Sequence, residues 1–183
     1  MGIYNCADTL SDAINSIIKQ TYANWELILC DDGSQDDTYQ VALKYKERYP
    51  DKIILLKNKE NIRLAATLNH CAKYATGKYI ARMDGDDLAL PDRFEKQVDF
   101  LEEHPEYALV GTYMKAFDEE GEKNVIPIKE IPVKTDLPKF NPFHHATVMM
   151  KREAFEALEG YRVSKLTTRA EDVDLWFRFF ANG

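Results

Sequence analysis

Two spacings of apolar residues alternate along the first half of the chain, one typical of helices and one typical of buried strands. Apolar positions three or four residues apart, which mark one face of a helix, recur in the segments 9–20, 36–50, 63–77 and 91–105. Short continuous apolar runs of strand length separate these helices, at 26–30, 52–58 and 78–83. Residues 1–5 resemble the end of a further strand. This alternation predicts an α/β fold with a mostly parallel sheet and helices on both faces.

The pattern becomes less regular after residue 104. Residues 107–133 predict a hairpin with a proline-bearing second arm, followed by a strand near 145–151 and helices at 152–160 and 169–179. We therefore expect a single domain over residues 1–183 that consists of two halves, 1–104 and 105–183. The short first strand and the helix that runs to the last residues also predict a fragment truncated at both ends.

Composition narrows the class of protein. The chain has 183 residues, of which 45% are hydrophobic, and a formal net charge of −7. This length and hydrophobic content suffice for one folded core. The acidic balance argues against a nucleic-acid partner, because nucleic-acid-binding proteins normally present a basic face. The sequence contains no secretion signal and no apolar run near the ~20 residues that a membrane span needs, so we expect a cytoplasmic protein.

The three cysteines, Cys6, Cys30 and Cys71, are far apart in the sequence. Because no two of them have the spacing of a paired motif, they predict neither a zinc site nor a disulfide framework. Cys30 and Cys71 lie in apolar runs and are predicted to be small core residues.

Polar clusters follow three of the predicted strands, at Tyr4-Asn5, at 31–34 ("DDGS") and at 84–87 ("DGDD"). In an open parallel sheet, ligands bind outside the carboxyl ends of the strands. The predicted topology therefore brings acidic groups that are distant in sequence to one edge of the sheet.

The "DGDD" cluster places three carboxylates within four residues. One interpretation is an acidic turn that caps the following helix. The other is a site for a hard divalent cation such as Mg²⁺ or Mn²⁺, which would relieve the repulsion and take further ligands from a diphosphate.

The other candidates also have a structural and a functional interpretation. Asp32 and Gly33 form either a simple tight turn or a contact for a nucleobase or ribose, and Arg63 is either a phosphate ligand at a helix start or a surface residue. Glu171 and Asp172 either begin a helix that Trp176 anchors in the core, or form a general base beside an aromatic platform. His144 and His145 are either ligand contacts or ordinary surface and core histidines.

Taken together and in order, "YN", "CDDGS", "ARMDGDD", "LPDRFEKQ" and "AEDVDLWFR" resemble the family 2 glycosyltransferases of the GT-A fold, and among them the bacterial enzymes of cell-surface polysaccharide synthesis. The resemblance implies inversion at the anomeric carbon, a nucleotide-diphosphate sugar as donor with a UDP-sugar favoured, and a saccharide or lipid-linked saccharide as acceptor. It implies Mn²⁺ or Mg²⁺ as cofactor. It makes residues 1–104 the nucleotide-sugar-binding half and residues 105–183 the acceptor-binding half. Segments outside this sequence would mediate peripheral association with the inner face of the membrane.

By position, the resemblance assigns Tyr4 and Asp32 to the nucleotide pocket and Asp84 to the region of the ribose and the metal. The family often has a glycine where this chain has Arg63, so the shape of that loop is in question, and Arg63 becomes a candidate contact for the base or the diphosphate.

For catalysis, the resemblance makes Asp86 the direct metal ligand with Asp87 in support. It makes Asp172 the general base, with Glu171 as the alternative. Two other classes remain open, a nucleotidyltransferase and a nucleotide-sugar-binding module with weak or no catalysis. The first normally carries a glycine-rich and basic phosphate loop near its first strand, which "MGIYNCADT" lacks.

Overall fold

The computed structural model describes residues 1–118 and 120–182. Helices α1 to α6 span Ala7–Ile18, Thr38–Arg48, Leu64–Ala72, Arg93–Glu103, Arg152–Ala157 and Glu171–Ala181. Strands β1 to β8 span Gly2–Ile3, Leu27–Asp31, Ile53–Lys57, Tyr79–Ala81, Leu109–Val110, Met114–Asp118, Gly121–Ile126 and Met149–Lys151. Two short 3₁₀ helices, η1 and η2, span Lys134–Asp136 and His145–Thr147. No helix in the described part of the chain is long and apolar enough to cross a bilayer.

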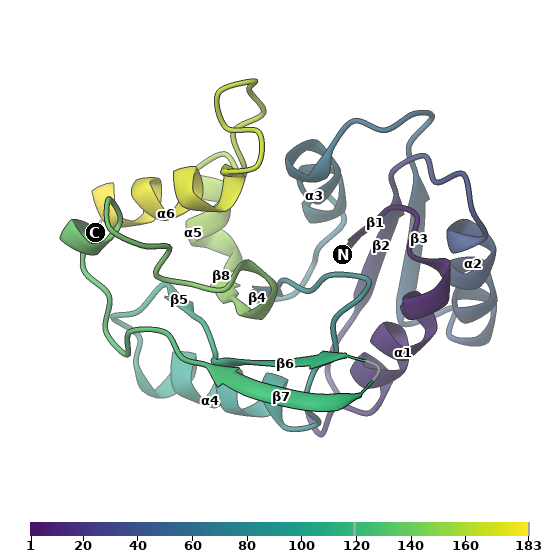
Figure 1. The fold of residues 1–183 in the computed structure, drawn as a ribbon, viewed down its shortest axis with the longest axis horizontal. Helices are drawn as coiled ribbons and strands as arrows, with labels where there is room; N and C mark the ends of the chain where they lie inside the picture. Colours follow the sequence, from purple (N-terminus) through teal and green to yellow (C-terminus); the bar gives the residue numbers. More distant parts are fainter. Residues whose placement is uncertain (119, 183) are drawn as a thin grey trace.

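The first sheet has the predicted parallel arrangement, with the order β1-β2-β3 and helices on both faces (Figure 1). Successive side chains of β2 alternate between the two faces. Leu27 and Leu29 pack with α1 and α2 in one apolar cluster, whereas Ile28 and Cys30 pack with Cys71 of α3 in another. Cys30 and Cys71 are buried, which confirms their prediction as core residues.

Strand β4 differs from the prediction. It pairs antiparallel with β8 in a second sheet of order β4-β8-β5, not parallel with the first sheet. The physical reason is that β4 takes its backbone hydrogen bonds from β8, whereas β1 has two residues and, in the described part of the chain, pairs only with β2. A cavity of about 640 Å³ separates β2 from β4 and is lined by Met1, Ile28 and Ile80 among others.

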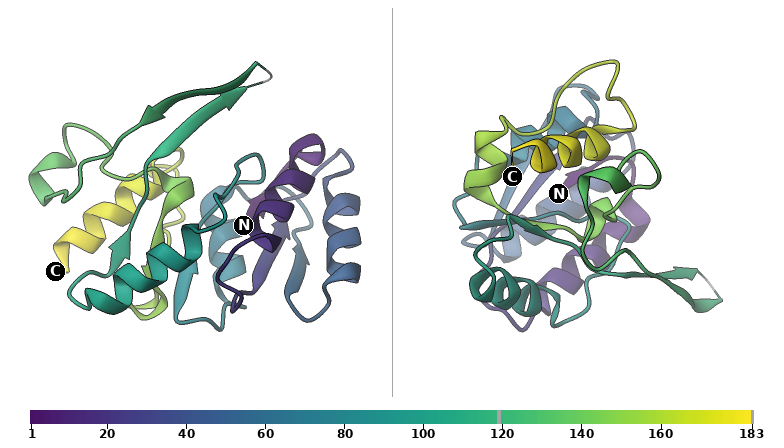
Figure 2. Two further views of the ribbon diagram at one scale, coloured as in Figure 1. Left: turned by 90° about the horizontal axis from the view of Figure 1, so that it is seen from below. Right: turned by 90° about the vertical axis from the view of Figure 1, so that its left-hand side faces the viewer.

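The second half of the chain adds a hairpin and a helical layer. Strands β6 and β7 form the predicted hairpin, which projects from the body of the molecule (Figure 2). Glu119, which falls within the predicted hairpin, lies outside the described residues. Helices α5 and α6 pack against β8 in a cluster that contains the fully buried Leu175 and Trp176. This packing fixes the amino end of α6 relative to the sheets.

Candidate active site

Asp32, just beyond the carboxyl end of β2, is buried and holds the loop that follows β3. Its Oδ1 atom accepts hydrogen bonds from Asn58 Nδ2 at 2.8 Å and from the backbone N–H of Ile62 at 2.9 Å. Its Oδ2 atom accepts one from the backbone N–H of Arg63 at 3.0 Å. An ionised carboxylate offers about four acceptor positions, so Asp32 shapes this loop and keeps about one position for a ligand.

Arg63 has a backbone conformation that glycine normally adopts. Its φ of 74° and ψ of 161° lie in a region that is essentially restricted to glycine and costs about 1–3 kcal/mol for other residues. The conformation persists because the Arg63 N–H is held by both Asp32 Oδ2 and Asn61 Oδ1. The shape of this loop was in question because Arg63 replaces a glycine that the family often has; the loop has a glycine-like backbone geometry, with an arginine side chain added.

Replacement of Arg63 by glycine should stabilise the fold. Relief of the backbone strain, less the greater flexibility of glycine in the unfolded chain, should raise the free energy of unfolding by about 1 kcal/mol. Urea unfolding measures this change. Arg63→Ala is the matched control, because it removes the guanidinium but keeps the strained backbone, and it should not be stabilised. If Arg63→Gly were less stable than Arg63→Ala, the inference that the backbone of Arg63 is strained would be wrong.

Tyr4, Asp32, Arg63 and Glu171 line one pocket of about 1090 Å³. The structure thus brings three of the residues predicted to bind the donor together with one of the two predicted catalytic carboxylates. The opposite wall comes from the segment between α5 and α6 and contributes three basic residues, Arg162, Lys165 and Arg169. The pocket therefore combines an acidic end at Asp32 with a basic wall and draws on both halves of the chain.

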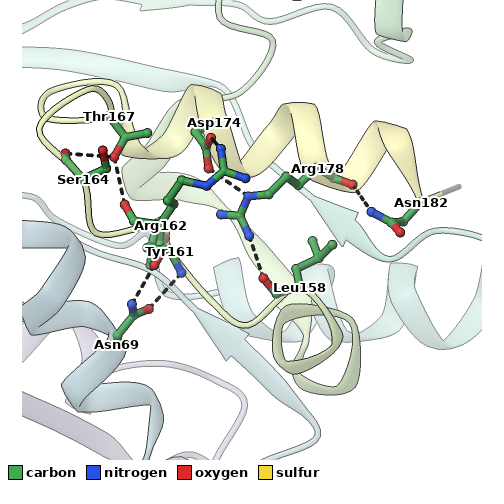
Figure 3. Close-up of polar contacts among 9 residues, drawn as sticks. All are labelled: Asn69, Leu158, Tyr161, Arg162, Ser164, Thr167, Asp174, Arg178 and Asn182. Atoms are coloured by element: carbon green, nitrogen blue, oxygen red, sulfur yellow. Dashed lines mark hydrogen bonds and ion pairs between the residues drawn. The ribbon is translucent and has the colours of Figure 1, made fainter.

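The segment between α5 and α6 is fixed at its base by paired polar contacts (Figure 3). Asn69 of α3 donates to the carbonyl oxygen of Tyr161 at 2.7 Å and accepts from its N–H at 2.8 Å. Arg162 pairs with Asp174 of α6 at 2.6 Å, and Arg178 binds the other carboxylate oxygen at 2.8 Å. These contacts fix the positions of the basic wall and of the amino end of α6 relative to α3.

Asp84, Asp86 and Asp87 form the acidic cluster that the sequence predicts after β4. They each present a carboxylate oxygen within 4.8 Å of the others. Gly85 allows the turn to lie against the start of α1, since a Cβ atom there would fall 2.8 Å from the Cys6 sulfur. The distance between the oxygens is short enough for a single ion to contact several of them.

Two buried arginines balance part of this negative charge. Arg82 pairs with Asp84, and Arg93 donates to the carbonyl oxygen of Arg82 at 2.8 Å. Burial, and then the charge of Arg82, lowers the pKa of Arg93 to about 10. Burial, and then the charges of Asp84 and Asp86, raises the pKa of Asp87. The negative charge around Asp86 and Asp87 is therefore under-compensated, and three hard oxygen ligands fit Mn²⁺ or Mg²⁺.

Asp172 and Glu171 begin α6 and face different surroundings. Glu171 lies on the wall of the donor pocket. Asp172 Oδ2 accepts a hydrogen bond of 2.6 Å from Asn141 Nδ2, which belongs to the second-half segment between η1 and η2.

Trp176 of α6 and the neighbouring His145 are structural residues. Trp176 is fully buried and contacts the rings of Phe143, His145 and Phe179. Its interpretation as a core anchor is confirmed, and a platform for a sugar ring is excluded. Burial and the charge of Arg82 hold the pKa of His145 well below its usual range. His145 is hydrogen-bonded to the Tyr161 hydroxyl at 2.7 Å, which makes it a satisfied interior histidine.

Two curated relatives are similar over almost the whole chain. EpsE of Bacillus subtilis (strain 168) is 53% identical over 183 residues, which is 100% of this chain and 66% of EpsE. The amylovoran biosynthesis glycosyltransferase AmsE of Erwinia amylovora is 30% identical over 96% of this chain and 65% of AmsE. The chain thus spans slightly less than two thirds of the length of these relatives.

Two solved structures have the same fold at low sequence identity. Staphylococcus aureus TarS 1-349 in complex with UDP superposes with a TM-score of 0.80 at 19% identity, over 99% of this chain and 54% of TarS. The mannosyltransferase PcManGT from Pyrobaculum calidifontis, in complex with GDP-Man and Mn²⁺, superposes with a TM-score of 0.69 at 22% identity, over 89% of this chain and 46% of PcManGT. These likenesses establish the GT-A fold. Residues 1–159 match the glycosyl transferase family 2 pattern, so the chain belongs to that family.

Proposed function

We propose that this protein is a metal-dependent inverting glycosyltransferase, which moves a sugar from a nucleotide-diphosphate sugar to a hydroxyl acceptor in the synthesis of a bacterial cell-surface polysaccharide. The observation that carries the proposal is a pocket that Asp32, Arg63 and Glu171 line together. The acidic turn at 84–87 adjoins this pocket, because Gly85 lies against Ile3, which also lines it.

Donor binding is assigned to the pocket of about 1090 Å³. Asp32 has one acceptor position left for an N–H of the nucleobase, and Tyr4 offers its exposed ring beside it. Arg63 provides positive charge for the diphosphate, and Asp84 lies toward the ribose and the metal. The UDP in the TarS complex and the GDP-mannose in the PcManGT complex support a nucleotide-sugar donor, with a UDP-sugar favoured.

Asp86 and Asp87 would hold the divalent ion, and the Mn²⁺ of PcManGT supports this assignment. When bound, such an ion supplies Lewis-acid stabilisation to the nucleoside diphosphate that leaves. Arg82 pairs with Asp84 and leaves Asp86 and Asp87 for the ion.

Asp172 acts as the general base in this proposal. It takes the proton of the acceptor hydroxyl while the hydroxyl oxygen forms a bond to the anomeric carbon. The bond from that carbon to the diphosphate oxygen breaks on the opposite face, which inverts the configuration. Glu171 is the less suitable base, because it lies on the donor wall.

The acceptor half, residues 105–183, would bind a saccharide or a lipid-linked saccharide. The name of the relative AmsE, which refers to amylovoran biosynthesis, supports a polysaccharide product. A lipid-linked acceptor would bring the protein to the inner face of the membrane.

Calorimetric titration with UDP, GDP, ADP, CDP and dTDP, each with and without Mn²⁺, tests the donor assignment. We expect binding of one nucleotide class, UDP first, and only when Mn²⁺ is present. If the folded protein binds none of the five under either condition, the donor assignment is wrong.

A further inference from the structure

The contact between Asn141 and Asp172 joins two parts of the second half that are distant in sequence. Asn141 lies between η1 and η2, 31 positions before Asp172. Its Nδ2 atom is 2.6 Å from Asp172 Oδ2, a short distance for an amide donor and consistent with a charge-assisted hydrogen bond. The first turn of α6 contains three carboxylates, at Glu171, Asp172 and Asp174.

The orientation of the Asn141 amide follows from its second contact. Its Oδ1 atom accepts the backbone N–H of Phe143 at 3.3 Å, so the carbonyl side of the amide is already used within its own turn. Only the NH₂ side is left to face Asp172, and an ionised carboxylate can only accept. Both contacts select the same orientation of the amide, in which it donates to Asp172.

The segment that carries Asn141 and the helix that carries Asp172 pack against each other. Phe143 packs edge-on against Trp176 with ring centroids 5.2 Å apart, and Trp176 is one turn after Asp172 on α6. Leu137, just before this segment, is buried in the cluster that contains Trp176. The segment and the helix therefore form one packed unit, and little entropy is lost when the amide meets the carboxylate.

We propose that Asn141 is a positioning residue for the general base. It holds Oδ2 of Asp172 and so fixes the carboxylate rotamer, while Oδ1 has no hydrogen-bond donor within residues 1–118 and 120–182 and is free to accept the proton of the acceptor hydroxyl. This inference rests on the proposed function, in which Asp172 is the base. It also gives the irregular second half a direct part in catalysis, besides acceptor binding.

Steady-state kinetics of Asn141→Ala test the inference, with a panel of UDP-sugars and GDP-mannose as donors in Mn²⁺. Loss of a charge-assisted hydrogen bond that orients a reacting group should lower kcat about 10- to 100-fold. The affinity for the bare nucleoside diphosphate, measured by calorimetry, should not change. Asn182→Ala is the matched control, because Asn182 lies at the other end of α6 and its side chain, among residues 1–118 and 120–182, donates only to the carbonyl oxygen of Arg178. This variant should keep the wild-type kcat.

The double variant Asn141→Ala/Asp172→Asn separates the two proposals. If Asn141 acts through Asp172, the double variant turns over no more slowly than Asp172→Asn alone. A wild-type kcat for Asn141→Ala, beside a strongly impaired Asp172→Asn, overturns the role of Asn141 and leaves the base in place. A wild-type kcat for Asp172→Asn overturns the assignment of Asp172 as the base and this inference with it. No turnover of any donor by the wild type overturns the proposed function.

A measurement without substrate tests the contact itself. The side-chain ¹H–¹⁵N signals of Asn141, assigned through their loss in Asn141→Ala, should shift in Asp172→Asn. They should not shift in Glu171→Gln, which keeps the Asp172 carboxylate. Signals that are unchanged in Asp172→Asn would show that the contact is absent in solution and would overturn the proposal.

Discussion

Asp172→Asn should lower the turnover of the protein by about 10²- to 10⁴-fold, the usual contribution of a general base. The amide has nearly the shape of the carboxylate but cannot take the proton of the acceptor hydroxyl at neutral pH. Donor binding should change little, since Asp172 does not line the donor pocket. Release of nucleoside diphosphate in the presence of an acceptor measures turnover, and calorimetry measures donor affinity.

Glu171→Gln is the companion to this variant. Glu171 is the adjacent carboxylate in the same helical turn but lies on the donor wall, so its loss should affect the KM for the donor more than kcat. The opposite outcome, a large fall in kcat for Glu171→Gln with a wild-type rate for Asp172→Asn, would transfer the role of base to Glu171.

Much of the fold was predictable because the local patterns agree with the tertiary structure. Helix α4, expected over 91–105, forms over Arg93–Glu103 and buries the apolar face that defined it, with Phe94, Val98 and Leu101 inside. The pairing of β4 was not predictable from such patterns. Its apolar run fits a parallel or an antiparallel neighbour equally well, and the choice depends on β8, about seventy residues later.

The site residues that directly follow strands were predictable from the sequence. The side chains that bind those residues from distant parts of the sequence were not. The sequence marks Asp32 as a polar residue at a strand end, but Asn58, which binds it, is only the last residue of the apolar run 52–58 and carries no signal of that contact. Arg82 was identifiable, because a basic residue ends an apolar run two positions before Asp84, yet only the structure shows that it pairs with that carboxylate. Asn141 carries no local signal, since its role depends on a helix that begins 30 residues later.

Asp86→Asn should abolish the metal dependence of nucleotide binding. Asp86 is the exposed member of the acidic cluster, and loss of one of the two carboxylates that would hold the ion should weaken the binding of Mn²⁺ by at least about 10- to 100-fold. UDP affinity in Mn²⁺ should then fall to the level measured without metal. Calorimetry with UDP, and the effect of the protein on the proton relaxation of water in Mn²⁺ solution, measure the two quantities.

The stability of the same variant in metal-free buffer separates the metal site from an acidic turn that only caps a helix. Burial, and then the negative charges of Asp84 and Asp86, raises the pKa of Asp87, so the like charges of the cluster repel one another without a cation. Removal of the Asp86 charge should then leave the midpoint of thermal unfolding equal to or above that of the wild type. Residues that are kept for function often lower stability in this way. Asp99→Asn, the same charge change at an exposed position on α4, corrects for the change in net charge. A marked loss of stability in Asp86→Asn relative to Asp99→Asn, with Mn²⁺ binding intact, would favour the capping turn and contradict the metal site.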